Sequence, residues 1–207
     1  MNSVERINHW ETIYKTKTQQ EVSWYQPIPS TSIDLILGNQ TQKNSKIIDV
    51  GGGDSLLVDF LLDNGFTSIS VLDVSTTAIE RAKSRLGDRA RLVNWIVDDA
   101  STYHSNEKYD VWHDRAAFHF FTSPSDIEAY VTTVNKHLNE SGLLILGTFS
   151  ESGPEKCSGI TIQQYSENTL SKLFSATFQK LKCFTVDHQT PFKTQQNFLF
   201  CSFKKIS

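Results

Sequence analysis

Three consecutive glycines, Gly51 to Gly53, directly follow the short run KIIDV, which contains Asp49. Because glycine has no Cβ, a ligand can come close to the backbone N–H groups of such a turn. Asp73 lies 24 residues after Asp49 and ends the next β-branched run, SISVLD. A carboxylate in that position can accept hydrogen bonds from ribose hydroxyls. Each feature alone is explained by a tight turn or a helix cap, but together, at this spacing, they predict a nucleoside site.

Two kinds of nucleoside site compete for a glycine-rich turn of this type. A dinucleotide site requires G-x-G-x-x-G, whose last glycine permits close helix packing, and Leu56 occupies that position here. The sequence instead resembles class I S-adenosylmethionine-dependent methyltransferases. In that family an acid is followed by G-x-G-x-G, which is matched here by Asp49, Gly51 and Gly53, with Ser55 in place of the last glycine.

The resemblance covers roughly residues 45 to 205. Asp73, in VLDVS, matches the acid that binds ribose, and Asp99, in VDDAS, matches the acid beside the adenine, although its neighbour Asp98 fits as well. A further family motif matches YDVWHDRAAFHFF. The resemblance implies S-adenosyl-L-methionine as the cofactor, bound by residues of the motifs and of an N-terminal segment: Asp49, Gly51, Gly52, Gly53, Asp73, Val74, Asp99, Ala100, His113 and Trp24.

Two local resemblances indicate different methyl acceptors. HDRAAF, residues 113–118, is similar to the D-R-A-A-L segment of thiopurine-type S-methyltransferases, which act on small thiol or heterocyclic compounds, and VSWYQ is similar to the segment that helps to cover their cofactor. SWYQ, GGGDS and LLDNGFTSISVLDVS also resemble eukaryotic protein-lysine methyltransferases, but Asp114-Arg115-Ala116 replaces their D-K-G segment. We therefore expect an enzyme with a small-molecule acceptor. A protein-lysine N-methyltransferase and a non-catalytic S-adenosylmethionine-binding interaction module are the alternatives.

Asp114, Arg115 and His119 are the candidates for the acceptor side of the site. The guanidinium of Arg115 can bind a carboxylate through two parallel hydrogen bonds, or it can pair with Asp114 and fix the end of a strand. His119 can accept a proton near the transferred methyl group. Its phenylalanine neighbours favour a packed histidine instead.

Two segments are expected to cover the site. Residues 149–166 form a long loop after a predicted strand, and loops of that length at a ligand-binding edge are often functional. Cys157, within it, is expected to be a small polar loop residue without a chemical role, because only Lys156 is near enough in sequence to lower its pKa. Trp24 and Tyr25 suit a lid, although packing of the N-terminal segment explains them nearly as well.

The elements that must position these residues alternate along the chain. β-branched runs predict strands at 46–50, 68–73, 91–97, 109–114 and 142–150, with helices between them. A helix predicted at 167–178 is followed by two strand-like runs, 180–188 and 196–205, which have no helix between them and should pair antiparallel. We predict an α/β fold with a Rossmann-like, seven-stranded, mostly parallel sheet, helices on both faces and a C-terminal antiparallel hairpin.

The chain length of 207 residues suits one domain, 1–207, with a helical cap or lid at 1–40 and a Rossmann-like core at 41–207. A net charge of −3 gives no electrostatic reason to expect nucleic acid as a partner. The N-terminus is unlike a signal peptide, and no apolar run approaches the roughly 20 residues of a membrane span. Cys157, Cys183 and Cys201 show no CxxC spacing, so neither a disulfide nor a metal site is expected. A cytoplasmic protein without a membrane partner follows, and its oligomeric state stays open.

Overall fold

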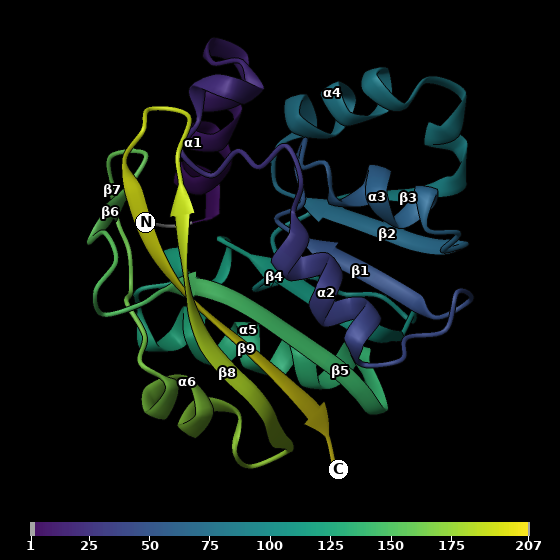
Figure 1. Cartoon of the computed structure of the whole chain (residues 1–207), viewed down its shortest axis with the longest axis vertical. Helices are drawn as coiled ribbons and strands as arrows, with labels where there is room; N and C mark the ends of the chain where they lie inside the picture. The colour runs from purple at the N-terminus through teal and green to yellow at the C-terminus, as the bar shows by residue number, and fades with distance from the viewer. Residues whose placement is uncertain (1–2, 207) are drawn as a thin grey trace.

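Seven strands form one sheet in the computed structural model, which describes residues 3–206 (Figure 1). The strand order is β3-β2-β1-β4-β5-β9-β8. The strands are β1 (Lys46–Val50), β2 (Ser68–Asp73), β3 (Val93–Val97), β4 (Tyr109–Arg115), β5 (Leu138–Phe149), β8 (Phe178–Gln189) and β9 (Gln195–Lys205). Neighbours among β1 to β5 are parallel, whereas β9 runs antiparallel to both β5 and β8. The predicted mostly parallel sheet with a C-terminal antiparallel hairpin is confirmed.

Helices cover both faces of this sheet (Figure 1). One hydrophobic core holds side chains of α2 (Ser30–Gly38), α3 (Leu57–Asp63) and α4 (Thr76–Leu86), and the other holds side chains of α5 (Pro124–His137) and α6 (Glu167–Phe174). The remaining elements are α1 (Ser3–Thr16), the 3-10 turns η1 (Gln19–Glu21), η2 (Gly87–Leu92) and η3 (Phe118–Phe120), and the short strands β6 (Lys156–Cys157) and β7 (Ile160–Thr161). Among the described residues no helix is both long and apolar enough to span a membrane.

Strand β9 shows why the hairpin at the end of the chain belongs to the sheet. Phe198 and Phe200 pack into the first core, while Leu199, Cys201 and Phe203 pack into the second. Side chains alternate between the two faces of a strand, so a continuous apolar run is what a strand buried on both faces requires. Because β9 lies between β5 and β8, both of its edges are also paired.

The helix predicted at 167–178 is shorter than expected. α6 ends at Phe174, and Phe178 begins β8, where it pairs with Lys205. The two phenylalanine rings lie 5.6 Å apart in the same core. The spacing of four between them therefore mimics a helical period, although the chain has already left the helix.

Cys183 and Cys201 form a disulfide, so the expectation of no disulfide is wrong. The two residues are direct partners in the register of β8 and β9, with their Cα atoms 4.2 Å apart. A hairpin brings residues 18 apart in the sequence to facing positions, and the spacing alone gives no sign of this pairing. Cys157 is the free cysteine, and it is buried.

Candidate active site

The carboxyl ends of β1, β2, β3 and β4 meet at one edge of the sheet, where two adjoining cavities lie. Cavity A is lined by Asp73, Val74, Asp99 and Ala100 among others, and cavity B by Asp49, Gly52 and His113 among others. Tyr14, Trp24, Gly51 and Arg115 line both cavities. The structure therefore brings together the residues predicted to bind the cofactor, except Gly53, which lines neither cavity.

Asp73 ends β2 as a buried carboxyl group. Its Oδ1 accepts a hydrogen bond of 2.8 Å from the backbone N–H of Ser75, the N-cap residue of α4. Burial is the main cause that raises the pKa of Asp73, and the charges of Asp54 and Asp49 add to it, so that the pKa reaches about 7 despite this hydrogen bond. Asp73 consequently titrates near neutral pH, and its ionised form can accept hydrogen bonds from hydroxyl groups of a ligand.

Asp99 follows β3 with all its oxygen atoms engaged. Its Oδ1 accepts hydrogen bonds from the backbone N–H and the hydroxyl of Ser101, while its Oδ2 accepts one of 3.0 Å from Ser3 and pairs with Arg6 Nε at 3.2 Å. Asp98, which the sequence left as an alternative, lies outside the residues that line cavities A and B. Of the two acids, Asp99 is therefore the one that faces the site.

The glycine turn is dictated by the packing of the protein itself. The backbone N–H groups of Gly51 and Gly52 both donate to Leu72 O, at 2.8 and 3.3 Å. Gly51 has a φ of +65°, and a Cβ there would lie 2.5 Å from the Cβ of Ala117. At Gly53, with a φ of +45°, a Cβ would lie 2.7 Å from the hydroxyl of Tyr14. The loop needs glycine with or without a ligand.

A buried chain of hydrogen bonds supports cavity B. His113 Nδ1 lies 2.7 Å from Asp49 Oδ1, and its Nε2 lies 2.8 Å from the hydroxyl of Ser32 on α2. His113 and Asp49 are nearly inaccessible to solvent. The chain ties β1, β4 and α2 together, so both predicted residues hold the wall of the cavity in place.

Arg115 and Asp114 do not pair, so that alternative for Arg115 is wrong. They are consecutive on β4, and consecutive side chains of a strand point to opposite faces of the sheet. Asp114 accepts hydrogen bonds from the backbone N–H groups of Ala117 and Phe118 and a 2.6 Å bond from the Tyr130 hydroxyl. Burial raises the pKa of Asp114 to about 6. Asp114 lines neither cavity in this arrangement, and its place on the acceptor side stays a prediction.

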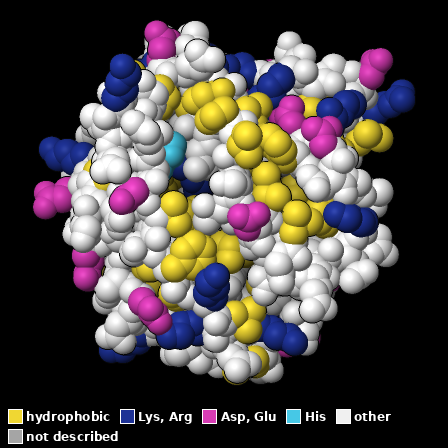
Figure 2. All heavy atoms as spheres, viewed as in Figure 1, with side chains coloured by type: hydrophobic (Ala, Val, Ile, Leu, Met, Phe, Trp, Pro, Cys, Tyr) yellow, Lys and Arg dark blue, Asp and Glu magenta, His cyan; other side chains and the backbone are white. Residues whose placement is uncertain are grey.

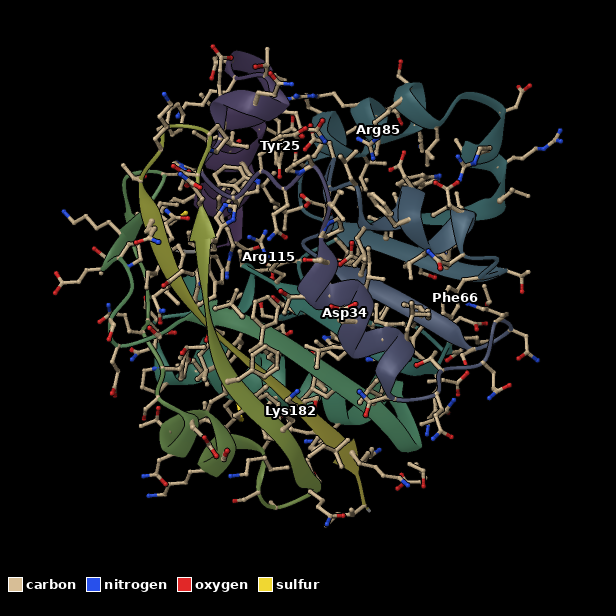
Figure 3. All side chains as sticks on the ribbon, viewed as in Figure 1. Tyr25, Asp34, Phe66, Arg85, Arg115 and Lys182 are labelled. Carbon is tan, nitrogen blue, oxygen red and sulfur yellow. A yellow bond between two sulfur atoms is a disulfide. The ribbon has the colours of Figure 1, made fainter. Side chains whose placement is uncertain are left out.

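Arg115 lies between the strand ends and the N-terminal segment that carries Tyr25 (Figure 3). Its Nη1 donates a 2.9 Å hydrogen bond to Trp24 O, and its guanidinium lies 4.8 Å from the centre of the Phe198 ring. Its Nε and Nη2 are buried and have no hydrogen-bond partner. Burial lowers the pKa of Arg115 to about 10, so the group is still a cation at neutral pH.

His119 is a packed core residue. Its ring stacks on Phe149 with the centroids 4.5 Å apart, and its Nδ1 lies 3.4 Å from the backbone N of Phe149. Burial, followed by the charge of Arg115, lowers the pKa of His119 to about 3. It lines neither cavity, which agrees with the alternative of a packed histidine, and its place on the acceptor side stays a prediction.

The sequence missed how α1 contributes to the site. Arg6, Trp10 and Tyr14 line cavity A, and Trp10 packs edge-on against Trp24 and Phe120 at 5.5 and 4.9 Å between centroids. Successive members of this set are four residues apart, which places all three on one face of the helix. That spacing could have identified Arg6, whereas Ile7, which also fits a helical period with Trp10 and Tyr14, is exposed.

Helix α1 is held against α4 at two points. Glu11 accepts hydrogen bonds from the Ser75 hydroxyl at 2.9 Å and from the backbone N–H and hydroxyl of Thr77 at 3.0 and 2.6 Å. Arg81 donates to the backbone oxygens of Tyr14 and Lys17 at 3.0 and 2.8 Å. Burial favours a higher pKa for Glu11, but the hydrogen bonds outweigh it and lower the pKa to about 2.

Cys157 is a buried residue of the site, so the expectation of a small polar loop residue is wrong. It lines cavity A and is buried, because the short β6–β7 hairpin turns it inward. Burial raises the pKa of the Cys157 thiol to about 11. The side chain is therefore a neutral thiol at neutral pH.

Both cavities are small in this arrangement. Their volumes are about 80 Å³ for cavity A and about 40 Å³ for cavity B, whereas ligand pockets commonly measure about 300–1,000 Å³. Aromatic side chains of α1 and of the 22–26 segment fill much of the space above the strand ends. In this arrangement neither of the two cavities has room for a ligand as large as a nucleoside.

Comparisons with known proteins agree with this architecture. Residues 48–144 match the family model described as "Methyltransferase domain". The malonyl-[acyl-carrier protein] O-methyltransferase of Anoxybacillus flavithermus is 29% identical over 106 residues, which are 51% of this chain and 39% of that protein. The eEF1A lysine and N-terminal methyltransferase of Bos taurus is 25% identical over 95 residues, 45% of this chain and 13% of that protein. The chain thus spans well under two thirds of the length of these curated relatives.

The fold itself matches solved structures over the whole chain. The N-methyltransferase NodS from Bradyrhizobium japonicum WM9, in complex with S-adenosyl-L-homocysteine, superposes with a TM-score of 0.74 at 14% identity, covering 100% of both chains. At that identity the similarity concerns the fold.

Proposed function

We propose that the chain contains a class I S-adenosylmethionine-dependent methyltransferase domain and that the protein transfers a methyl group from S-adenosylmethionine to a small-molecule acceptor. The observation that carries the proposal is the meeting of Asp73, Asp99 and Gly51 on the wall of cavity A. Each follows or ends a different parallel strand, at the edge where sheets of this kind bind ligands.

The residues present fit this cofactor. Asp73 can accept hydrogen bonds from ribose hydroxyls. Asp99 can accept a hydrogen bond from the adenine amino group if the contact of Ser3 or Arg6 with its Oδ2 breaks. Val50, Leu72 and Ala100 supply apolar walls to cavity A. S-adenosylmethionine supplies an electrophilic methyl group bonded to a sulfonium.

The protein's own part in the reaction is alignment and exclusion of water. Trp10, Trp24 and Phe120 form an aromatic cover over the strand ends. His119 is packed away from the cavities, and Cys157 keeps its proton at neutral pH. Neither is placed to remove a proton, so the proposal favours an acceptor atom that is already unprotonated when it meets the methyl group.

The N-terminal segment acts as a lid in this proposal, within one domain of residues 1–207 whose core spans 41–207. Support comes from the ion pair between Arg6 and Asp99, the hydrogen bonds of Glu11 to the start of α4 and the small volume of the cavities. Opening of α1 admits the cofactor, and reclosure removes water from the site.

The charge of the site favours a small acceptor over a protein lysine, the alternative. A lysine side chain would have to enter beside the buried guanidinium of Arg115, which has no carboxylate partner among the described residues. Two cations close together in a poorly solvated cavity repel each other strongly. On the face seen in Figure 2, basic side chains are scattered among acidic ones without a continuous basic stripe, which agrees with a proposal that involves no nucleic acid.

Isothermal titration with S-adenosyl-L-homocysteine tests cofactor binding first. Transfer from radiolabelled S-adenosylmethionine is then measured with thiols, amines, carboxylates and a protein lysate as acceptors. A labelled small molecule supports the proposal, and a labelled protein band supports the lysine alternative. Binding without transfer to any acceptor indicates a non-catalytic module, and no binding of either cofactor form removes the proposed function.

A further inference from the structure

Only one of the three nitrogen atoms of the Arg115 guanidinium donates a hydrogen bond, and the other two have no partner. Nη1 donates to Trp24 O, and the flat face of the group lies against the ring of Phe198. Nε and Nη2 are buried without a partner, and the residue lines both cavities. A buried N–H group without a partner destabilises the folded state, and more so when the group is charged. Two such groups on one side chain require an explanation.

The positive charge of Arg115 also lacks a partner. No carboxylate among the described residues forms an ion pair with it, and Asp114 is turned to the opposite face of the sheet. The charges that act on it are those of Asp49 and Cys157, and Cys157 keeps its proton at neutral pH. Burying an unpaired cation is unfavourable, so the folded protein carries this charge at a loss in stability.

The free atoms have the geometry of an oxyanion site. Nε and Nη2 lie on the same edge of the guanidinium, and this edge donates two parallel hydrogen bonds to the two oxygens of a carboxylate. The contacts with Trp24 and Phe198 hold the group in one orientation, so little entropy is lost on binding. Trp10, Trp24 and Phe120 supply flat apolar walls nearby.

We propose that the Nε–Nη2 edge of Arg115 binds a carboxylate or another flat oxyanion inside the active site. The inference rests on the proposed function of the same site and names the chemistry of its ligand. Two molecules can supply the anion, namely the methyl acceptor and the amino-acid tail of the cofactor. Arg115 lines cavity A together with Asp73 and cavity B together with Gly52. From this position it can bind an anion of the methyl acceptor or of the cofactor.

Three probes separate the two sources in calorimetric titrations. S-adenosyl-L-homocysteine carries the amino-acid carboxylate, 5′-deoxy-5′-methylthioadenosine lacks the whole tail, and benzoate is a flat carboxylate without a nucleoside. Benzoate is titrated with and without saturating S-adenosyl-L-homocysteine. The variants are Arg115→Met, which keeps the length of the side chain, and Arg115→Lys, which keeps the charge without the fork. Lys182→Met is the matched control, because Lys182 also lies over a phenylalanine ring, Phe184 at 4.8 Å, but on an exposed strand (Figure 3).

If the cofactor supplies the anion, Arg115→Met lowers the affinity for S-adenosyl-L-homocysteine at least tenfold and changes the affinity for methylthioadenosine less than threefold. Arg115→Lys then recovers only part of the lost affinity. If the acceptor supplies it, both nucleosides stay within threefold, while benzoate binds the wild type and not Arg115→Met. The inference is overturned if the wild type and Arg115→Met have equal affinities for all three probes. It is also overturned if both proteins bind the two nucleosides with equal affinity and the wild type does not bind benzoate. A wild type that binds benzoate through Arg115 but neither nucleoside removes the proposed function and leaves the anion site standing.

Thermal denaturation distinguishes a ligand-binding arginine from a structural one. Because the ligand-free protein holds an uncompensated cation, Arg115→Met is expected to melt at or above the wild-type temperature. Saturating S-adenosyl-L-homocysteine or benzoate, whichever binds through Arg115 in the titrations, is expected to raise the wild-type midpoint more than that of the variant. A large fall in the midpoint of Arg115→Met, with equal ligand-induced shifts in both proteins, assigns the residue to the fold instead.

Discussion

Arg6 on α1 forms a buried ion pair with Asp99, which follows β3, and the Nε and Oδ2 atoms lie 3.2 Å apart. The guanidinium also lies 4.5 Å from the centre of the Phe121 ring. This pair closes cavity A beside the acid that is proposed to face the adenine. Under that proposal, cofactor binding and the position of α1 are coupled through a single carboxylate.

Arg6→Met is expected to release α1 from the core. Removing one partner of a buried ion pair costs about 3–5 kcal/mol, and α1 can relieve part of that cost by detaching while the sheet stays folded. Limited proteolysis should then cut within residues 3–16 faster than in the wild type, with a small change in the global melting temperature. Lys17→Met, which removes an exposed cation just beyond the helix, serves as the control and should leave the cleavage rate unchanged. Equal cleavage of Arg6→Met and the wild type would falsify the role of the pair in closure.

Glu11 gives the closure of α1 a pH dependence. Its pKa is lowered to about 2 in the folded protein, below the usual value for glutamate near 4.5. A carboxyl with a lowered pKa contributes stability that is present above the unfolded value and is lost as the pH falls through the folded value. Protection of the α1 amides from hydrogen exchange, corrected for the intrinsic rate, should therefore fall between about pH 4.5 and 2 in the wild type. In Glu11→Gln the protection should be lower at pH 7 and change little across this window.

The sequence was sufficient for the sheet and for the acids at its edge, and insufficient for contacts that depend on facing side chains. Alternation of strands and helices implies that Asp73 and Asp99 end up at one edge, whatever the packing details. Of the two alternatives for Arg115, the pairing with Asp114 was wrong because it took neighbours in sequence as neighbours in space, although successive side chains of a strand point to opposite faces. Arg6 was missed because Ile7 also fits the helical period with Trp10 and Tyr14.

The disulfide and the buried thiol were missed for a different reason. The pairing of Cys183 with Cys201 follows from the register of β8 and β9, and register is set by which faces are buried and by the turn. Cys157 is buried because a two-residue turn, Ser158 and Gly159 with φ of +50° and +80°, folds the loop back over the site. Neither register nor turn direction can be derived from the spacing of cysteines.

The Cys183–Cys201 disulfide predicts a stability that depends on the redox state. Closing a loop of this length restricts the unfolded chain, which is worth about 3 kcal/mol for a loop of about 15 residues. Reduction, or Cys201→Ser, should lower the melting temperature by several degrees, whereas Cys157→Ser should make the protein no more sensitive to a reductant. Thiol titration after denaturation without a reductant should detect one free thiol, that of Cys157. Three free thiols in protein purified under oxidising conditions would contradict the pairing.

Asp73 predicts that cofactor affinity rises with pH near neutrality. Its pKa is raised to about 7, chiefly by burial and further by the charges of Asp54 and Asp49, and only the ionised form offers two acceptor oxygens to ribose hydroxyls. With such a pKa, the ionised fraction rises roughly tenfold between pH 6 and 8, and the association constant for S-adenosyl-L-homocysteine should rise by up to the same factor. Asp73→Asn should bind more weakly than the wild type at pH 8, with little dependence on pH.

The same group has the opposite effect on folding in the absence of ligand. Because the pKa of Asp73 is raised in the folded state, the folded chain binds more protons than the unfolded chain between pH 3.8 and about 7, so its contribution makes stability fall as the pH rises through this window. Asp73→Asn should flatten that fall in unfolding experiments. Asp54→Asn removes a neighbouring negative charge and should keep the pH dependence of binding but shift it to lower pH. If the affinity of the wild type for S-adenosyl-L-homocysteine is the same at pH 6 and pH 8, Asp73 does not hold the ribose as an ionised acceptor.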